Sequence, residues 1–260
     1  MQSIKDTEIL NSVSETYEGI AESWDRVRRR PGKIWDALLP YIPQGARVLD
    51  VGCGNGRLSE FLSGKNVRYT GLDGSAKLIG IARNRYSSLS SPSAIGDPDN
   101  DRGSRIKSGM TDVQFLVSDM RSLPFEDDAF DAVCCLAAFH HLPSESTRRR
   151  ALSEMFRVTK PGGVLLMLNW NLYHPVKSFR YGLWRLLWNQ RDVEIPWKLP
   201  EEKKVFHRYY HSFFLRELRA LAGSEGWNVE KIEYINNNGH AYLWNGLFSF
   251  VVARKKGNTV

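Results

Sequence analysis

Short apolar runs alternate with amphipathic segments along most of the chain. The apolar runs have the length of buried strands and end in polar residues, and we predict strands at 47–51, 67–72, 113–117, 131–136 and 164–169. The segments between them place apolar residues at helical spacing, and we predict helices at 57–63, 75–86 and 144–159. Strands that alternate with helices need right-handed crossovers, so the pattern predicts an α/β fold with a parallel sheet.

Further elements precede and follow this unit. Residues 8–30 carry apolar side chains near a period of 3.6 and predict a helix, and 34–41 predicts a second one that ends before Pro43. The C-terminal part predicts a helix at 212–224 and strands at 227–235 and 246–254. The turn sequence 236–239 between these strands favours an antiparallel pair. We therefore expect a seven-stranded, mostly parallel sheet with one antiparallel strand and helices on both faces.

Two stretches interrupt the alternation. Residues 87–112 are rich in Ser, Pro, Gly, Asp and Asn without periodicity, and they predict a flexible surface insertion. Residues 171–211 follow the fifth strand and combine tryptophans with many Arg and Lys residues. We interpret this segment as a lid-like insertion on the substrate side of a single domain that spans 1–260.

The composition indicates what kind of partner and what cellular compartment to expect. The chain has 36 Lys and Arg against 29 Asp and Glu, a net charge of +7 that favours an anionic partner. Its three cysteines lack C-x-x-C spacing, so free thiols in a reducing compartment are expected rather than a zinc site. No segment approaches the roughly 18 apolar residues of a membrane span, and the start of the chain lacks a signal-like core. A soluble, cytoplasmic protein is the expectation.

The turn after the first strand carries the most informative motif. The strand ends in Asp50, and Gly52, Gly54 and Gly56 follow before a helix. Glycine lets backbone amides approach a ligand closely, and such strand-to-helix turns bind nucleotide-like ligands in α/β sheets. The Gly-x-Gly-x-Gly spacing differs from the Gly-x-Gly-x-x-Gly of dinucleotide enzymes. An acid at this end also suits an ammonium group better than a pyrophosphate.

This turn resembles that of the class I S-adenosylmethionine-dependent methyltransferases, which have a Rossmann-like α/β fold. The resemblance implies that Asp50 and the glycine turn hold the methionine part of the cofactor, Asp73 the ribose hydroxyls and Asp119 the adenine amino group. A lone acid after a strand is more often a helix cap, but acids after successive strands favour a cofactor site. The implied cofactor-binding residues are Asp50, Gly52, Cys53, Gly54, Asn55, Gly56, Asp73, Gly74, Asp119, Met120, Leu136 and Ala137.

Two other segments sharpen the resemblance. The first contains His140-His141 and the second is His207–Phe213. Taken alone, they read as polar loop residues near a ligand and as the start of an amphipathic helix with buried aromatics. Together with Tyr17-x-x-Ile20-Ala21, Arg28-x-x-Pro31 and the segment 192–198, they resemble the tRNA methyltransferases that esterify 5-carboxymethyluridine at the wobble position. Asn169-Trp170-Asn171 departs from the Trp-Ala pair common in that family.

The resemblance implies an enzyme that transfers a methyl group to a carboxylate. A carboxylate is already ionised at neutral pH, so positioning matters more than a general base. The residues expected to orient it, which we class as catalytic, are Arg28, His140, Arg208, Tyr210 and His211. The implied substrate is a tRNA anticodon loop. The basic residues that could contact this RNA are Arg26, Arg28, Arg29, Arg30, Lys33, Arg180, Arg185, Arg191, Lys198, Lys203 and Lys204.

Other interpretations stay open at this point. Eukaryotic members of the family commonly work with a small zinc-binding activator protein, so such a partner is implied, with a chain that acts alone as the alternative. The second functional class is a small-molecule methyltransferase with a quinone-like or lipid-like acceptor. The third is a non-catalytic subunit that only binds the cofactor. The net positive charge and the Arg208–His211 segment favour an RNA substrate. The presence of Asp50, Asp73 and Asp119 argues against a non-catalytic subunit.

Overall fold

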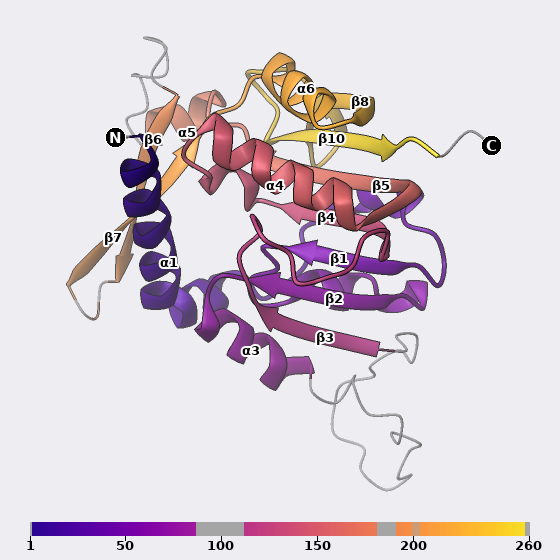
Figure 1. Cartoon of the computed structure of the whole chain (residues 1–260). Coiled ribbons are helices and arrows are strands. Elements are labelled where there is room, and N and C mark those ends of the chain that lie inside the picture. The colour runs from indigo at the N-terminus through magenta and orange to yellow at the C-terminus, as the bar shows by residue number, and fades with distance from the viewer. Residues whose placement is uncertain (1, 87–111, 181–190, 200, 202, 258–260) are drawn as a thin grey trace, which may run out of the picture.

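The computed structural model describes residues 2–86, 112–180, 191–199, 201 and 203–257, and its main feature is an eight-stranded sheet (Figure 1). The strand order is β3-β2-β1-β4-β5-β10-β8-β9. The parallel strands are β1 (Arg47–Val51), β2 (Arg68–Asp73), β3 (Asp112–Val117), β4 (Phe130–Leu136) and β5 (Thr159–Trp170). The antiparallel part comprises β8 (Trp227–Asn236), β9 (Gly239–Ala241) and β10 (Phe248–Lys255). The strand order reverses direction between β1 and β4, which creates the switch point where such sheets bind ligands.

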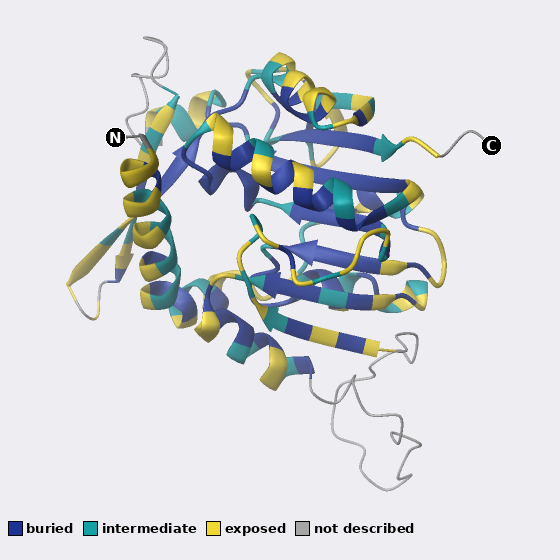
Figure 2. Ribbon diagram, viewed as in Figure 1, coloured by how far each residue is buried: buried dark blue, intermediate teal, exposed yellow. Residues whose placement is uncertain are grey.

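Helices cover both faces of the sheet. On one face pack the 3₁₀ helix η1 (Lys33–Tyr41), α2 (Arg57–Phe61) and α3 (Ala76–Tyr86), and on the other α4 (Glu145–Val158) and α6 (Leu215–Ser224). In β5, Leu166 and Leu168 face the first layer, whereas Leu165 and Met167 face the second. Because both faces are buried, the central strands read as nearly continuous apolar runs (Figure 2). Shorter elements are η2 (Ser63–Lys65), η4 (Phe139–His141) and α5 (Pro175–Arg180).

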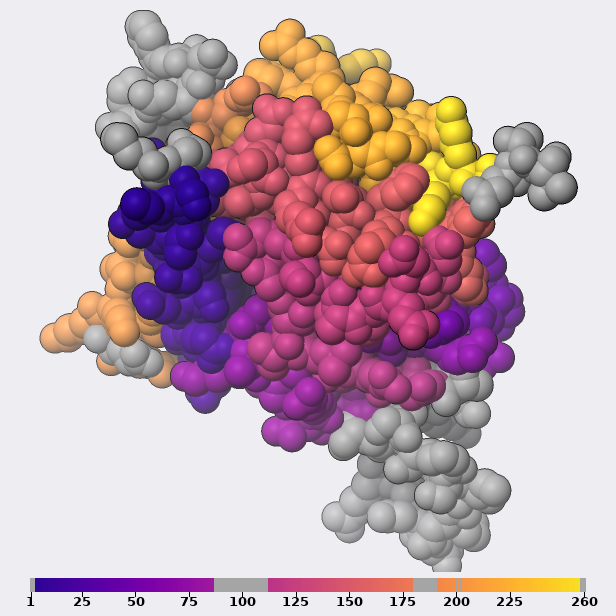
Figure 3. All heavy atoms as spheres, in the orientation of Figure 1, coloured from indigo at the N-terminus to yellow at the C-terminus, as the bar shows by residue number. Residues whose placement is uncertain are grey.

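The N-terminal helix α1 (Gln2–Val27) lies across the end of the sheet toward which β1 and β2 point (Figure 1). It packs against α3 and β7 and forms a ridge along that end of the molecule (Figure 3). The Thr16 hydroxyl donates to the backbone oxygen of His207 at 3.2 Å, and the backbone N–H of Lys77 donates to Glu18 at 3.1 Å. These bonds fix α1 over the carboxyl ends of the parallel strands.

The segment after β5 contains a separate hairpin of β6 (Asp192–Leu199) and β7 (Lys204–His211). The interpretation of 207–213 as the start of a helix is wrong, since this segment belongs mostly to β7 and α6 begins at Leu215. The reason is that successive side chains of a strand point to opposite faces, so neighbouring residues of β7 have different surroundings. Tyr209 points toward Asp192 and Pro143, whereas Tyr210 points the other way and stacks on Trp170.

Most of the expected topology is confirmed, with one correction to the number of strands. The sheet is mostly parallel and β10 is antiparallel to both neighbours, but it has eight strands rather than seven because the Asn236–Gly239 turn leads into β9 instead of β10. The three cysteines are free and buried, as expected. Of the predicted insertion at 87–112, residues 87–111 lie outside the described residues and Asp112 opens β3. The single-domain organisation and the lid role of 171–211 stay predictions.

Along the described residues, no helix combines the length and the apolar character that crossing a membrane requires.

The close approach of the β1 turn to β4 predicts that Gly52→Ala destabilises the fold. Gly52 has φ +76°, and an added Cβ would lie 2.2 Å from the Cβ of Ala138. Gly45→Ala is the matched control, because Gly45 has φ +73° with open space around it. Both variants carry the left-handed penalty of about 1–2 kcal/mol, and only Gly52→Ala adds overpacking of about 1–3 kcal/mol. Equal losses in urea unfolding would contradict this close packing.

Candidate functional site

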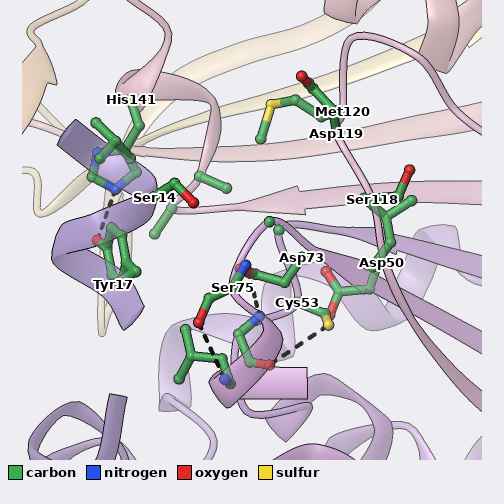
Figure 4. A pocket seen from close by; sticks show the side chains of 18 of the residues that line it. Ser14, Tyr17, Asp50, Cys53, Asp73, Ser75, Ser118, Asp119, Met120 and His141 are labelled. Carbon is green, nitrogen blue, oxygen red and sulfur yellow. Dashed lines mark hydrogen bonds between the residues drawn. The ribbon is translucent and has the colours of Figure 1, made fainter. Parts of the chain in front are cut away.

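A cavity of about 440 Å³ lies at the carboxyl ends of β1, β2, β3 and β4, beneath α1 (Figure 4). This volume is in the range of small-molecule and cofactor sites. Of the predicted cofactor-binding residues, ten line it: Asp50, Gly52, Cys53, Gly54, Asp73, Gly74, Asp119, Met120, Leu136 and Ala137. Helix α1 adds a wall that the sequence reasoning did not include, made of Leu10, Asn11, Val13, Ser14, Tyr17 and Trp24.

Asp73 stands at the tip of β2 and organises the turn after β1. One carboxylate oxygen accepts from the backbone N–H of Gly54 and the other from that of Ser75, both at 2.9 Å. Burial raises the pKa of Asp73, while these backbone bonds oppose the rise. The carboxylate therefore ties the glycine turn to the residues just before α3 and still faces the cavity. Its remaining lone pairs can accept two ribose hydroxyls.

Asp50 is buried at the tip of β1 with one oxygen unused. The Tyr69 hydroxyl donates to Oδ2 at 2.6 Å, whereas Oδ1 has no hydrogen-bond partner among the described residues. Burial raises the pKa of Asp50 to about 7. A buried carboxylate oxygen without a donor, at the edge of a cavity, fits an ammonium group of a ligand.

Asp119 and Ala137 complete the rim at the ends of β3 and β4. Arg121 donates to both carboxylate oxygens of Asp119, at distances from 2.6 to 3.1 Å. Partial burial would raise the pKa of Asp119, but the hydrogen bonds from Arg121 outweigh it and the pKa is lowered. Ala137 has φ +60°, a strained conformation for alanine that is common at functional sites.

Two predicted cofactor residues do not line the cavity. The Asn55 side-chain amide donates to Asp25 at 2.6 Å and to the backbone oxygen of Arg28 at 3.0 Å, so it ties the turn to α1. Gly56 is covered by the rings of Phe115 and Tyr86, which leave no room for a Cβ. Both residues shape the turn, and their positions do not support direct contact with the cofactor.

Tyr17 and His141 form the wall on the α1 side of the cavity (Figure 4). The Tyr17 hydroxyl lies 2.9 Å from Nε2 of His141, and Nδ1 of His141 lies 2.7 Å from the backbone oxygen of Tyr209. Because that carbonyl can only accept, Nδ1 carries the proton and the Tyr17 hydroxyl donates to Nε2. Burial lowers the pKa of His141 to about 4, so this wall is neutral. The sequence showed the His140-His141 pair, but it did not show that His141 lines the cavity whereas His140 stacks on Tyr210.

Behind this wall, four predicted catalytic residues meet around an indole. We call Arg28, His140, Trp170, Arg208 and Tyr210 the Trp170 cluster. Tyr210 stacks between His140 and Trp170, with centroid distances of 4.7 and 5.3 Å. The Arg28 and Arg208 guanidinium groups each lie 5.9 Å from the centre of the Trp170 ring. Trp170 itself was not predicted as a site residue, because its segment departs from the family pattern.

The Trp170 cluster is positively charged. Arg208 is only 3% exposed, donates to the Tyr210 hydroxyl at 2.9 Å and leaves Nε unpaired. In the part of the chain that the structure describes, no carboxylate forms an ion pair with Arg28 or Arg208. Burial lowers the pKa of His140 well below its usual value, so His140 adds no charge.

His211 is not part of this cluster. Its Nδ1 lies 2.6 Å from Asp192 and its Nε2 lies 3.0 Å from Glu217. Arg191 also pairs with Glu217, so the group joins the β6–β7 hairpin to α6. With both ring nitrogens occupied by carboxylates, the position of His211 does not support the catalytic role predicted for it.

Fold and cavity together define a class: a Rossmann-like α/β enzyme that binds a nucleoside-bearing cofactor at the switch point of its sheet. Residues 49–167 match the family model described as "Methyltransferase domain". A "putative methyltransferase" of Encephalitozoon cuniculi is 31% identical over 218 residues, which cover 84% of this chain and 87% of that protein. The chain belongs to the S-adenosylmethionine-dependent methyltransferases, and S-adenosylmethionine is its cofactor.

Other relatives have more specific names. The tRNA (carboxymethyluridine(34)-5-O)-methyltransferase of Schizosaccharomyces pombe is 27% identical, over 87% of this chain and 92% of that protein. A relative of the same name from Xenopus tropicalis is 26% identical, and the chain spans only 36% of it.

Solved structures share the fold. A methyltransferase from Methanosarcina mazei has a TM-score of 0.62 at 22% identity and covers 85% of this chain and 98% of its own. A chain from the complex between the Haloferax volcanii Trm112 methyltransferase activator and a putative methyltransferase has a TM-score of 0.63 at 18% identity, with coverages of 95% and 99%.

We predict that Asp73→Ala weakens cofactor binding, measured by titration calorimetry with S-adenosylhomocysteine. Each lost charge-assisted bond to a ribose hydroxyl is worth about 1.5–3 kcal/mol, which is roughly tenfold or more in affinity. Asp112→Ala is the control, because Asp112 is an exposed acid at the opposite end of its strand. Unchanged affinity in Asp73→Ala would remove this carboxylate from the site.

We further predict that cofactor binding releases a proton from Asp50. Its pKa of about 7 leaves Asp50 partly protonated near neutral pH, and an ammonium group favours the ionised form. Affinity should therefore rise as the pH increases through about 7. Calorimetry in buffers of different ionisation enthalpy measures the released proton. The same release from Asp50→Asn would assign it to another group.

Proposed function

We propose that this chain methylates the carboxylate of a 5-carboxymethyl group on the wobble uridine of tRNA and so forms a methyl ester. Relatives that carry this activity in their names support the proposal. The match to the S. pombe protein extends over nearly its whole length, whereas the Xenopus protein is much longer than this chain.

The observation that carries the proposal is the unpaired charge of the Trp170 cluster. A buried guanidinium without an anionic partner is unfavourable, so Arg208 is suited to a substrate that brings a carboxylate. Guanidinium groups bind carboxylates with two parallel hydrogen bonds, which fixes the orientation of the acceptor. Arg28, which directly follows α1, supplies a second cation 5.9 Å from the centre of the Trp170 ring. A neutral quinone-like or lipid-like acceptor would leave both charges unmatched.

The proposed reaction does not require the protein to transfer a proton. S-adenosylmethionine supplies an electrophilic methyl group, and its transfer to a carboxylate oxygen forms a C–O bond, breaks the C–S bond and moves no proton. The chain's residues act by orientation and by excluding water. Trp170 and Tyr210 form an aromatic wall around the Arg208 guanidinium. His140 accepts the backbone N–H of Trp170 at Nδ1, at 3.3 Å, so its Nε2 is a neutral donor.

The surface around Arg28 suits the rest of the RNA. Arg28, Arg29 and Arg30 follow α1 and are all exposed. Arg29 lies 3.7 Å from Asp25, so it is partly neutralised, whereas the structure gives no ion pair to Arg30 among the described residues. Phosphates of the anticodon loop could contact this stretch. The affinity for tRNA should then fall as salt rises.

We also propose a small zinc-binding activator protein as partner. One similar fold comes from a complex with a methyltransferase activator. An edge of the sheet offers a place for it, because β3 is an edge strand. Coexpression with an activator of this kind, followed by gel filtration, tests the partnership. Separate elution of the two chains would contradict it.

The proposed function predicts base-labile methylation of tRNA. Tritiated S-adenosylmethionine and tRNA bearing 5-carboxymethyluridine should give filter-bound label, and mild alkali should remove it because an ester hydrolyses. The same tRNA with unmodified uridine at the wobble position is the control and should take up no label. Alkali-stable label would mean methylation of a base or ribose, and no transfer at low salt would contradict an RNA substrate.

Arg208→Ala should lower kcat/KM for tRNA by roughly tenfold or more while the affinity for S-adenosylhomocysteine stays unchanged. The expected size is that of one or two lost hydrogen bonds to a charged group. Arg254→Ala removes a half-exposed arginine at the far side of the sheet and serves as control. A parallel loss of cofactor affinity or of thermal stability in Arg208→Ala would make Arg208 structural instead.

A further inference from the structure

A third cation, which was not among the predicted site residues, lies near Trp170. Lys177, on α5, places its Nζ 5.0 Å from the centre of the Trp170 ring and 5.2 Å from that of Phe248. Its ammonium donates to the backbone oxygen of Leu247 at 2.6 Å. One hydrogen bond leaves two of its three donors available.

Lys177 has cations and neutral rings as neighbours and no carboxylate within the described ranges. The charged or titratable groups that face it are Arg28, Arg208, His140 and His174. Burial, followed by the charge of Arg28, lowers the pKa of Lys177 to about 7. Burial also lowers the pKa of both histidines, so neither adds a positive charge above neutral pH. An anion placed here would stabilise the charged lysine.

Three cations around one indole exceed what one carboxylate can neutralise. Arg28, Lys177 and Arg208 all lie within 6 Å of the Trp170 ring. A 5-carboxymethyluridine within RNA carries a second anion, the phosphate of its own backbone. A nucleotide that brings both groups would match the charge of this site better than the carboxylate alone.

We propose that Lys177 joins Arg28 and Arg208 in a two-anion site around Trp170, in which the arginines hold the substrate carboxylate and Lys177 holds the adjoining backbone phosphate. This assignment rests on the proposed function, because it needs an RNA nucleotide as the acceptor. The site selects a carboxylate within an RNA strand over the same carboxylate in a free nucleoside.

The lowered pKa of Lys177 determines how RNA binding depends on pH. A lysine with a lowered pKa is charged below that value and neutral above it. Phosphate contact through Lys177 therefore weakens as the pH rises through about 7, and KM for RNA increases. Binding of the phosphate raises the pKa again, so RNA binding takes up a proton.

The test is Lys177→Met, which keeps an unbranched side chain of similar length and removes its charge. The backbone oxygen of Leu247 still accepts from the N–H of Asn171 at 3.1 Å, so the local fold keeps a donor. With an anticodon stem-loop that carries 5-carboxymethyluridine, KM should rise about tenfold and kcat should change little. The slope of log KM against log salt should fall by about 0.7, the value for one phosphate of a single strand. The rise of KM with pH should disappear.

Lys177→Arg should restore the salt slope, and Lys256→Met, at an exposed lysine after β10, should behave like the wild type. A wild-type enzyme that fails to methylate the stem-loop would refute the proposed function. If the wild type is active and Lys177→Met keeps its KM and salt slope, the phosphate assignment is wrong. A lower kcat with an unchanged salt slope would also overturn it, since Lys177 would then act on the carboxylate. If Lys177→Met does not fold, Lys177→Gln takes its place.

Discussion

The anchoring of α1 across the ends of the parallel strands is the constraint on which both sites depend. Asp25 makes this anchor: it accepts from Asn55 at 2.6 Å and from Arg85 at 2.6 and 2.7 Å. Burial works against its ionisation, but these bonds outweigh burial and lower the pKa of Asp25. One carboxylate thus joins the helix to the glycine turn and to α3. Without α1 the cofactor cavity would lose a wall, and Arg28 would not reach Trp170.

The two sites differ in their electrostatics, and neutral side chains separate them. The cavity collects carboxylates at the strand ends, which suits a cofactor with an ammonium and a sulfonium group. The Trp170 cluster collects cations without carboxylate partners in the described structure, which suits an anionic acceptor. Tyr17 and His141 stand between the two, and His141 stays neutral because it is buried. The opposite charges of the carboxylate and the sulfonium would favour their direct approach beside these two residues.

The sequence allowed the sheet and the cofactor side to be predicted because both depend on local patterns. Apolar runs and helical spacing lie within single elements, and Asp50 and Asp73 lie at the carboxyl ends of their strands. The Trp170 cluster could be predicted only in part, because residues 28, 140, 170, 208 and 210 meet only through the tertiary fold. His211 looked equivalent to its neighbours in the sequence, yet the period of two along β7 turns it toward Asp192. Asn55 was predicted to contact the cofactor, but its side-chain N–H groups donate to the Asp25 carboxylate and to the backbone oxygen of Arg28.

The central claim is that the Trp170 cluster recognises a negatively charged acceptor. The most direct measurement compares two anticodon stem-loops by calorimetry with S-adenosylhomocysteine bound. One carries the 5-carboxymethyl group, and the other carries the uncharged 5-carbamoylmethyl group of nearly the same shape. The acid should bind about tenfold or more tightly than the amide, since charge-assisted bonds to Arg28 and Arg208 are lost in the amide. Equal affinity for the two RNAs would contradict the account.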